Sequence, residues 1–284
     1  MEVILAETAG FCFGVKRAVD TVYKQIEENP DRKIYTYGPI IHNAEVIKDM
    51  EARGVTVLQG EEDLQQAKDG IVIIRSHGVP KRICDRLDEL GISYVDATCP
   101  YVKKIHRIAM EEEEKGNHLV IIGNPDHPEV EGIKGWAGSE SVVVSNAEDA
   151  DGLAFPKGRR VCIVAQTTYN YNKFKDLVEI ISKKGYDIIV LNTICNATKK
   201  RQEEAARIAD RVDAMIVVGD RHSSNTQKLF EICKHACNNT YYIQTLGDLN
   251  GNQLRSVETV GITAGASTPN KIIEEVQNYV RINF

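Results

Sequence analysis

Short runs of branched apolar residues alternate with helical patterns along the whole chain. Nearly all of these runs are apolar at successive positions and bounded by Gly, Pro, Asn or Asp. Such runs are typical of parallel strands that helices cover on both faces. The predicted strands are Val3–Ala6, Lys33–Tyr37, Val55–Leu58, Ile71–Arg75, Ile92–Val95, Leu119–Ile122, Val142–Ser145, Val161–Ala165, Asp187–Leu191, Ala214–Val218, Thr240–Ile243 and Thr259–Thr263.

Three cysteines recur at matching places in this pattern. Cys12, Cys99 and Cys195 each follow a predicted strand and open a helix whose first turns carry a basic pair. Four predicted strands separate the first cysteine from the second and the second from the third, whereas three follow the third and one precedes the first. We therefore predict three α/β units, 13–98, 99–194 and 195–284, with the N-terminal strand in 1–12 completing the last.

The expected fold class is α/β, with three pseudo-symmetric units that each hold a mostly parallel four-stranded sheet. Ligands of open α/β sheets bind at the carboxyl ends of the strands. If the three units face one another, their strand-end loops line one central cavity in a trefoil arrangement. Because the period comes from counting strands, it predicts the number of units better than their boundaries.

Polar residues occupy equivalent strand ends in this repeat. One set lies at predicted helix starts, and a second set follows the next inner strand. Helix N-termini offer unpaired N–H groups and a dipole that favour phosphate. Because no carboxylate cluster accompanies the two sets, we expect a phosphate or diphosphate bound without Mg²⁺. The sets are His42, His127 and Ser223-Ser224-Asn225, and then His77, Thr167 and Ser267.

The seven cysteines indicate thiol chemistry rather than a disulfide framework, because their number is odd. Three convergent thiolates could hold zinc with an open fourth position, or an iron–sulfur cluster with one iron lacking a protein ligand. Spacing alone does not separate these options. In either case the open position could bind substrate and act as a Lewis acid. The other cysteines are interpreted as packing residues: Cys84, Cys162, Cys233 and Cys237.

Glu129 has two interpretations. It is an ordinary acidic residue of a first helical turn, or it is a proton donor beside the metal. A carboxyl in a partly desolvated cavity would have a raised pKa and could protonate an intermediate. His127-Pro128-Glu129 matches half of the zinc-deaminase motif, but no P-C-x-x-C follows, which excludes that family.

Charge and composition exclude several other classes. The net charge is −6 and the isoelectric point about 5.7, which argues against a general nucleic-acid binder. No apolar run is long enough for a membrane span, and no basic N-terminal region indicates a signal peptide, so we expect a cytoplasmic protein. A Walker A loop and a dinucleotide fingerprint are both missing. The acidic run Glu111–Glu114 is interpreted as the solvated end of a helix.

Seven short motifs, in this order along nearly the whole chain, resemble the 4-hydroxy-3-methylbut-2-enyl diphosphate reductase family. Each motif is weak alone, but the ordered set is specific. One departure is His222, where the family often has Asn before Ser-Ser-Asn. The motifs are Gly10-Phe11-Cys12-Phe13-Gly14-Val15, Ser76-His77-Gly78-Val79, Asp96-Ala97-Thr98-Cys99-Pro100, Gly123 through His127-Pro128-Glu129-Val130-Glu131-Gly132, Gln166-Thr167-Thr168, Ser223-Ser224-Asn225 and Thr263-Ala264-Gly265-Ala266-Ser267.

The resemblance implies a reductive dehydroxylation of an allylic diphosphate to isopentenyl and dimethylallyl diphosphate. It implies one [4Fe–4S] cluster per chain on Cys12, Cys99 and Cys195, and an electron donor such as ferredoxin or flavodoxin. Glu129, Thr167 and His127 match catalytic positions. The matched substrate contacts are His42, His77, His127, Thr167, Ser223, Ser224, Asn225 and Ser267.

Two rival functions remain open at this point. Quinolinate synthase also combines three cysteines, three pseudo-symmetric α/β units and an open iron, but it catalyses a condensation and dehydration without net reduction. A cluster- or zinc-binding sensor would bind metal without turnover. The His-Pro-Glu and Ser-Ser-Asn motifs favour the reductase.

Overall fold

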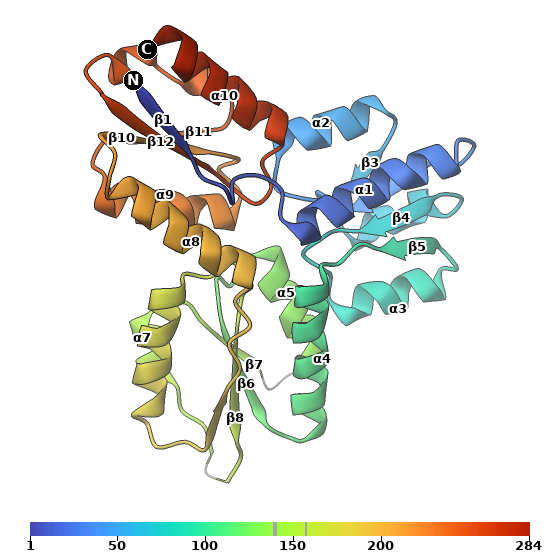
Figure 1. Ribbon diagram of the computed structural model, residues 1–284. Coiled ribbons are helices and arrows are strands. Elements are labelled where there is room, and N and C mark those ends of the chain that lie inside the picture. Colours follow the sequence, from blue (N-terminus) through green and yellow to red (C-terminus); the bar gives the residue numbers. More distant parts are fainter. Residues whose placement is uncertain (139–140, 157) are drawn as a thin grey trace. The chain divides into compact units, whose positions relative to one another are not determined.

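The computed structural model describes residues 1–138, 141–156 and 158–284, and these form twelve strands in three sheets (Figure 1). Every predicted strand is present, and its ends lie within one residue of the prediction. The strands are β1 (Glu2–Leu5), β2 (Ile34–Tyr37), β3 (Thr56–Leu58), β4 (Ile71–Ile74), β5 (Ser93–Asp96), β6 (His118–Ile122), β7 (Ser141–Val144), β8 (Val161–Ala165), β9 (Ile188–Val190), β10 (Ala214–Val218), β11 (Thr240–Ile243) and β12 (Thr259–Ala264).

Helices connect successive strands, as parallel pairing requires. Short 3-10 helices occupy Glu61–Ala67, Leu246–Asp248 and Gly251–Leu254. The α-helices are α1 (Phe13–Glu28), α2 (Ala44–Ala52), α3 (Lys81–Glu89), α4 (Pro100–Glu114), α5 (Pro128–Trp136), α6 (Ala147–Gly152), α7 (Tyr171–Ser182), α8 (Asn196–Ala209), α9 (Ser224–Ala236) and α10 (Asn270–Asn283).

Each sheet has four strands, and all strand pairs are parallel. The orders are β1-β12-β10-β11, β3-β2-β4-β5 and β7-β6-β8-β9. The two inner strands of each sheet are almost wholly buried, whereas the edge strands are half-exposed. The expected α/β class with three similar four-stranded parallel sheets is therefore confirmed.

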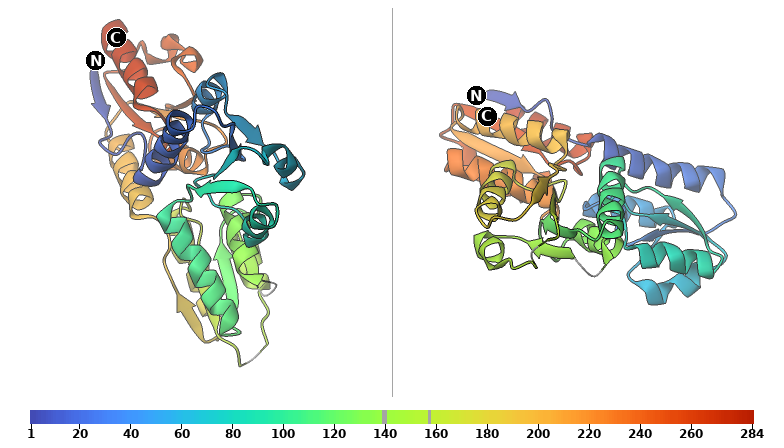
Figure 2. Two further views of the ribbon diagram at one scale, coloured as in Figure 1. Left: turned by 90° about the vertical axis from the view of Figure 1, so that its right-hand side faces the viewer. Right: turned by 90° about the horizontal axis from the view of Figure 1, so that it is seen from below.

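The chain divides into two compact units. The first, called the terminal unit, comprises Met1–Lys16, His42–Val46 and Cys195–Phe284. Its sheet has α10 on one face, while α8 and α9 cover the other (Figure 1). Strand β1 pairs with β12, so the N-terminal strand joins this last sheet, and the two chain ends lie together (Figure 2).

The second unit, called the central unit, comprises Arg17–Ile41 and Ile47–Ile194 and holds the other two sheets. Helix α3 packs on the β2–β5 sheet. Helices α4 and α5 cover one face of the β6–β9 sheet, and α6 and α7 cover the other. The three domain boundaries predicted from the sequence stay a prediction, although each sheet falls within one predicted unit.

One interpretation is wrong in detail. Glu112, in the acidic run at the end of α4, is only 5% exposed. Its carboxylate accepts hydrogen bonds from Lys115 and Asn117, each at 2.7 Å. Burial acts to raise the pKa of Glu112, but these bonds hold it below its usual value. The helix turns this position toward the protein, so only the rest of the run is solvated.

Among the helices of the described ranges, none combines the length and the apolar character that crossing a bilayer requires.

Candidate functional site

The three repeated cysteines share one backbone geometry. Each stands directly before a helix, and its carbonyl accepts the first intrahelical hydrogen bond, at 2.9, 2.9 and 3.0 Å for Cys12, Cys99 and Cys195. All three are half-buried. The thiolate is the form of cysteine that binds metal. Cysteine thiolates are the donors that hold iron–sulfur clusters.

The predicted anion-binding residues of the terminal unit are brought together. Ser223 is the N-cap of α9, and its hydroxyl accepts from the Ser267 hydroxyl at 3.3 Å. Asn225 is buried, and its Oδ1 accepts from the backbone N–H of Ala266 at 3.2 Å. The Nδ2 of Asn225 has no partner in the described part of the chain, which leaves a buried donor. Ser224, half-buried, begins the same helix.

His42 belongs to the same unit and lies just before α2. Asn43, not His42, makes the cap, because its Oδ1 accepts from Val46 N at 3.1 Å. Asp220 fixes this loop: it accepts from Ala44 N at 3.0 Å and from His222 N at 2.8 Å. Sequence reasoning missed this role of Asp220, although a carboxylate at the start of a turn is a known signal for such backbone bonds.

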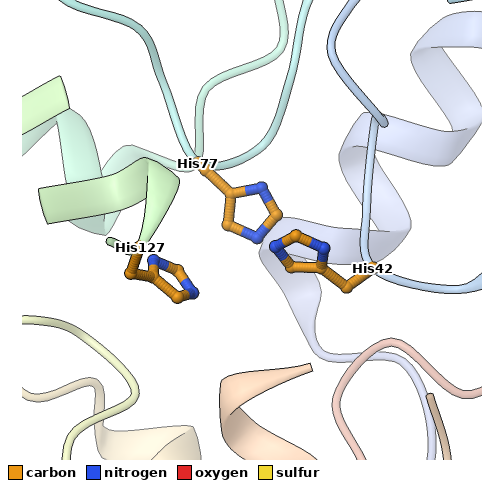
Figure 3. Close-up of side chains that lie close together, drawn as sticks. All are labelled: His42, His77 and His127. Atoms are coloured by element: carbon orange, nitrogen blue, oxygen red, sulfur yellow. The ribbon is translucent and has the colours of Figure 1, made fainter. Parts of the chain in front are cut away.

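The central unit holds the other two histidines. His127 is the N-cap of α5, and its Nδ1 accepts from Glu129 N at 3.1 Å. The His77 ring, from the loop after β4, meets the His127 ring edge-on with centroids 5.5 Å apart. Figure 3 shows both side chains. Within this unit, the two histidine side chains therefore lie next to each other.

Glu129 and Thr167 form a buried pair beside His127. Glu129 is 2% exposed, and its two carboxylate oxygens accept from Thr167 N at 2.6 Å and Thr167 Oγ1 at 2.7 Å. Burial raises the pKa of Glu129 to about 7, against the lowering effect of the Thr167 bonds. A carboxyl with this pKa can give up a proton at neutral pH, so the direction expected from the sequence agrees with its surroundings.

The packing behind the His77 loop was not predicted from the sequence. His106 stacks on Trp136 with centroids 5.3 Å apart, and the Trp136 Nε1–H donates to Val79 O at 2.8 Å. Gly78 has a positive φ of 73°, and a Cβ there would lie 2.6 Å from His106 Cε1. Burial lowers the pKa of His106 to about 4, so the ring is neutral and acts as packing.

The remaining cysteines are packing residues, as interpreted. Cys162 and Cys233 are fully buried, and Cys84 packs against a core cluster. Burial raises the pKa of Cys84 to about 11 and those of Cys162 and Cys233 to about 12, so these thiols stay neutral. The thiols of Cys233 and Cys237 both donate to backbone carbonyls. No disulfide joins residues within the described ranges.

Comparison with known proteins finds one family along the whole chain. A family model described as LytB protein matches residues 3–281. A 4-hydroxy-3-methylbut-2-enyl diphosphate reductase of Alkaliphilus oremlandii (strain OhILAs) is 48% identical over 277 residues, which cover 97% of this chain and 98% of that protein. The protein of the same name from Caldanaerobacter subterraneus subsp. tengcongensis is 44% identical, covering 97% of this chain and 95% of that one.

Two solved structures are also similar. The E-1-hydroxy-2-methyl-but-2-enyl-4-diphosphate reductase from Plasmodium falciparum superposes with a TM-score of 0.93 at 31% identity, covering 98% of this chain and 87% of that one. The second is described as (E)-4-hydroxy-3-methyl-but-2-enyl diphosphate reductase, the terminal enzyme of the non-mevalonate pathway. It gives a TM-score of 0.72 at 43% identity and covers 99% of both chains.

Proposed function

The chain belongs to the LytB family, and from that premise we propose that it reduces (E)-4-hydroxy-3-methylbut-2-enyl diphosphate to isopentenyl diphosphate and dimethylallyl diphosphate. The reaction consumes two electrons and two protons. The allylic C–O bond breaks, the hydroxyl leaves with one proton as water, and the other proton forms a C–H bond. The matches favour this reaction over the quinolinate-synthase-like alternative.

Family membership implies an iron–sulfur cofactor. We propose one [4Fe–4S] cluster per chain, with Cys12, Cys99 and Cys195 as its protein ligands. When bound, such a cluster supplies electrons and one iron without a protein ligand that acts as a Lewis acid. Support comes from the shared position of the three half-buried thiols at helix starts.

The substrate diphosphate is assigned to hydroxyl, amide and imidazole donors. Ser223, Asn225 and Ser267 form one group of donors at the start of α9. Helix N-terminal N–H groups add to them, because their dipole favours an anion. The proposed contacts are His42, His77, His127, Thr167, Ser223, Ser224, Asn225 and Ser267. Holding the tail in this way orients the reacting end of the substrate.

The buried Glu129–Thr167 pair is the structural observation that carries the proposal. The carboxyl of Glu129 has a pKa of about 7 and can give its proton to the Thr167 hydroxyl, which passes its own proton onward. His127 holds the backbone N–H of Glu129 and so fixes the start of α5. A metal-binding sensor has no need of a buried carboxyl with such a raised pKa.

The test is an anaerobic assay with the purified protein, a chemical reductant and the hydroxylated diphosphate. We expect iron and acid-labile sulfide in the protein and formation of both isoprenoid diphosphates. Iron-containing protein that makes neither product under these conditions would contradict the proposed reaction. Zinc in place of iron would contradict the proposed cofactor.

Two further expectations belong to this proposal. The electron donor is a small redox protein such as ferredoxin or flavodoxin, and the compartment is the cytoplasm. Turnover with each reduced carrier in place of the chemical reductant tests the first, and fractionation of the source cells tests the second.

A further inference from the structure

Arg201 is a buried cation in the terminal unit. Its side chain is only 3% exposed, although it follows two lysines in the basic stretch after Cys195. It lies on α8 one turn beyond Thr198 and one turn before Ala205, and both of these residues are buried too. The inward face of α8 therefore carries a guanidinium among buried side chains.

The guanidinium binds two backbone carbonyls that flank the Cys12 loop. Arg201 Nη2 donates to Gly10 O at 2.9 Å, two residues before Cys12. Arg201 Nη1 donates to Ala264 O at 2.7 Å, at the end of β12. Two residues later, Ala266 O accepts from Cys12 N at 3.2 Å. Since α8 begins directly after Cys195, one side chain connects the segments that carry two cysteines.

Neutral carbonyls do not balance a buried positive charge. No carboxylate lies within ion-pair distance of Arg201 in the ranges that the structure describes. Glu204, on the same helix, is committed elsewhere, since it accepts from Glu7 N at 2.9 Å and Thr8 N at 3.0 Å. The Nε of Arg201 is buried and lacks a partner in the same ranges.

Cys12 and Cys195 lie in the two segments that the guanidinium connects. Burial lowers the pKa of Arg201 to about 10, while the charges of Cys12, Glu204 and Cys195 act to raise it. The guanidinium is therefore still protonated at neutral pH. A buried charge is costly unless an opposite charge compensates it. The negative charge of a cluster bound through Cys12 and Cys195 would provide that compensation.

We propose that Arg201 is a positioning residue and a fixed positive charge for the two cysteines of the terminal unit, and that it favours the reduced state of the cluster bound there. This rests on the proposed iron–sulfur function. Reduction adds negative charge to a cluster, and a nearby cation in a weakly polar environment stabilises that added charge. The same hydrogen bonds hold Cys12 in register with Ala266.

The test compares three variants of the full-length protein. R201Q removes the charge and keeps hydrogen-bonding capacity, R201K keeps the charge, and E204Q alters the other side chain of α8 that holds the same loop. Iron content, circular dichroism and an anaerobic redox titration followed by electron paramagnetic resonance are measured for each. R201Q should lower the equilibrium constant for reduction of the cluster at least tenfold. For one electron this corresponds to a reduction potential lower by about 59 mV.

R201K should keep a potential near that of the wild type, and E204Q should not lower it. An iron-loaded R201Q with an unchanged potential would overturn the proposal. An equal lowering of the potential in all three variants would also overturn it, because Arg201 would then act only through its structural contacts. R201Q could fold but contain no iron. In that case, an R201K variant that contains iron and has the wild-type potential supports the proposal, whereas an R201K variant that also lacks iron contradicts it. A wild-type protein without iron would refute the proposed function instead.

Discussion

The two compact units carry different kinds of chemistry on the same α/β architecture. The terminal unit presents fixed groups: two cysteines, the buried Arg201 and hydroxyl and amide donors around Ser223. The central unit presents a buried acid, Glu129, whose pKa burial raises to about 7. Variants of Arg201 and of the donors around Ser223 should therefore change potential and binding, whereas variants of Glu129 should change proton delivery.

The largest effect is expected from the cysteines. Cys195→Ser should abolish iron binding and lower turnover about a thousandfold or more, since a metal centre supplies several kcal/mol of transition-state stabilisation. Iron analysis and the anaerobic assay check this. Cys84→Ser is the control, because Cys84 packs against a core cluster and should keep both iron and turnover. Retention of iron and turnover by the Cys195→Ser variant would remove Cys195 from the ligand set.

The next effect concerns the central unit. Glu129→Gln should keep the cluster and lower turnover about 100- to 10,000-fold, the usual contribution of general acid catalysis. The amide can still satisfy both Thr167 contacts, so the fold should persist. Turnover at saturating substrate and iron content are the measurements. A Gln variant as active as the wild type would exclude Glu129 from the proton relay.

The pH dependence sharpens the same point. Because the folded-state pKa of Glu129 is about 7 and its ordinary value is 4.5, the folded state binds this proton more tightly than the unfolded chain does. The resulting stabilisation is complete below about pH 4.5 and is lost as pH rises through about 7. Turnover should likewise fall above about pH 7.

Because a Gln side chain does not titrate, the Glu129→Gln variant does not lose this stabilisation as pH rises. At pH 8 its free energy of unfolding should exceed that of the wild type by up to about 3 kcal/mol. Denaturant titrations at pH 5 and pH 8 measure the difference. A gap between the two proteins that does not widen with pH would contradict the raised pKa.

A smaller effect is expected in the terminal unit. Asp220→Ala should raise KM about tenfold, because the loop that carries His42 loses its fixed position; a tenfold change corresponds to about 1.4 kcal/mol of binding free energy. The free energy of unfolding should fall by about 1–2 kcal/mol. Asp213→Ala is a matched control. Asp213 also accepts hydrogen bonds from backbone N–H groups, those of Glu258 and Thr259. It lies before the start of β10, however, whereas Asp220 lies after the end of β10. Equal KM values in the two variants would refute the positioning role of Asp220.

The smallest effect should come from Trp136→Phe. It removes the hydrogen bond to Val79 O and keeps a ring against His106, so the cost in unfolding free energy should be about 1 kcal/mol. Thermal unfolding measures it, with Phe155→Leu, which removes a stack on His118 in the same unit, as a control. A large loss of turnover in Trp136→Phe alone would show that the His77 loop depends on this contact.

The sequence predicted the strands well because each inner strand is a continuous apolar run between turn residues. It could not show how exposed each edge strand is, since Val190 in β9 is as apolar as Val164 in β8 and yet is exposed. It also mistook Glu112 for a solvated residue. A charged side chain can be buried where specific donors meet it, and those donors, on Lys115 and Asn117, are known only once the chain has folded.

Several candidate site residues were predicted because they recur in phase at strand ends, as Cys12, Cys99 and Cys195 do. Arg201 was missed, although the helical spacing of Thr198, Arg201 and Ala205 was a usable signal that it faces inward. What helical spacing cannot show is the pair of carbonyls, Gly10 O and Ala264 O, that receive its guanidinium.

The sequence by itself determined the α/β class, the threefold recurrence and the identities of the groups that can bind metal, anion or proton, because hydrophobic period and residue type are local properties. Only the tertiary structure decided which carboxyl is desolvated and which cation is buried. The pKa of Glu129 and the charge balance of Arg201 depend on neighbours from distant segments, on Thr167 and on Gly10, and such neighbours are set by packing.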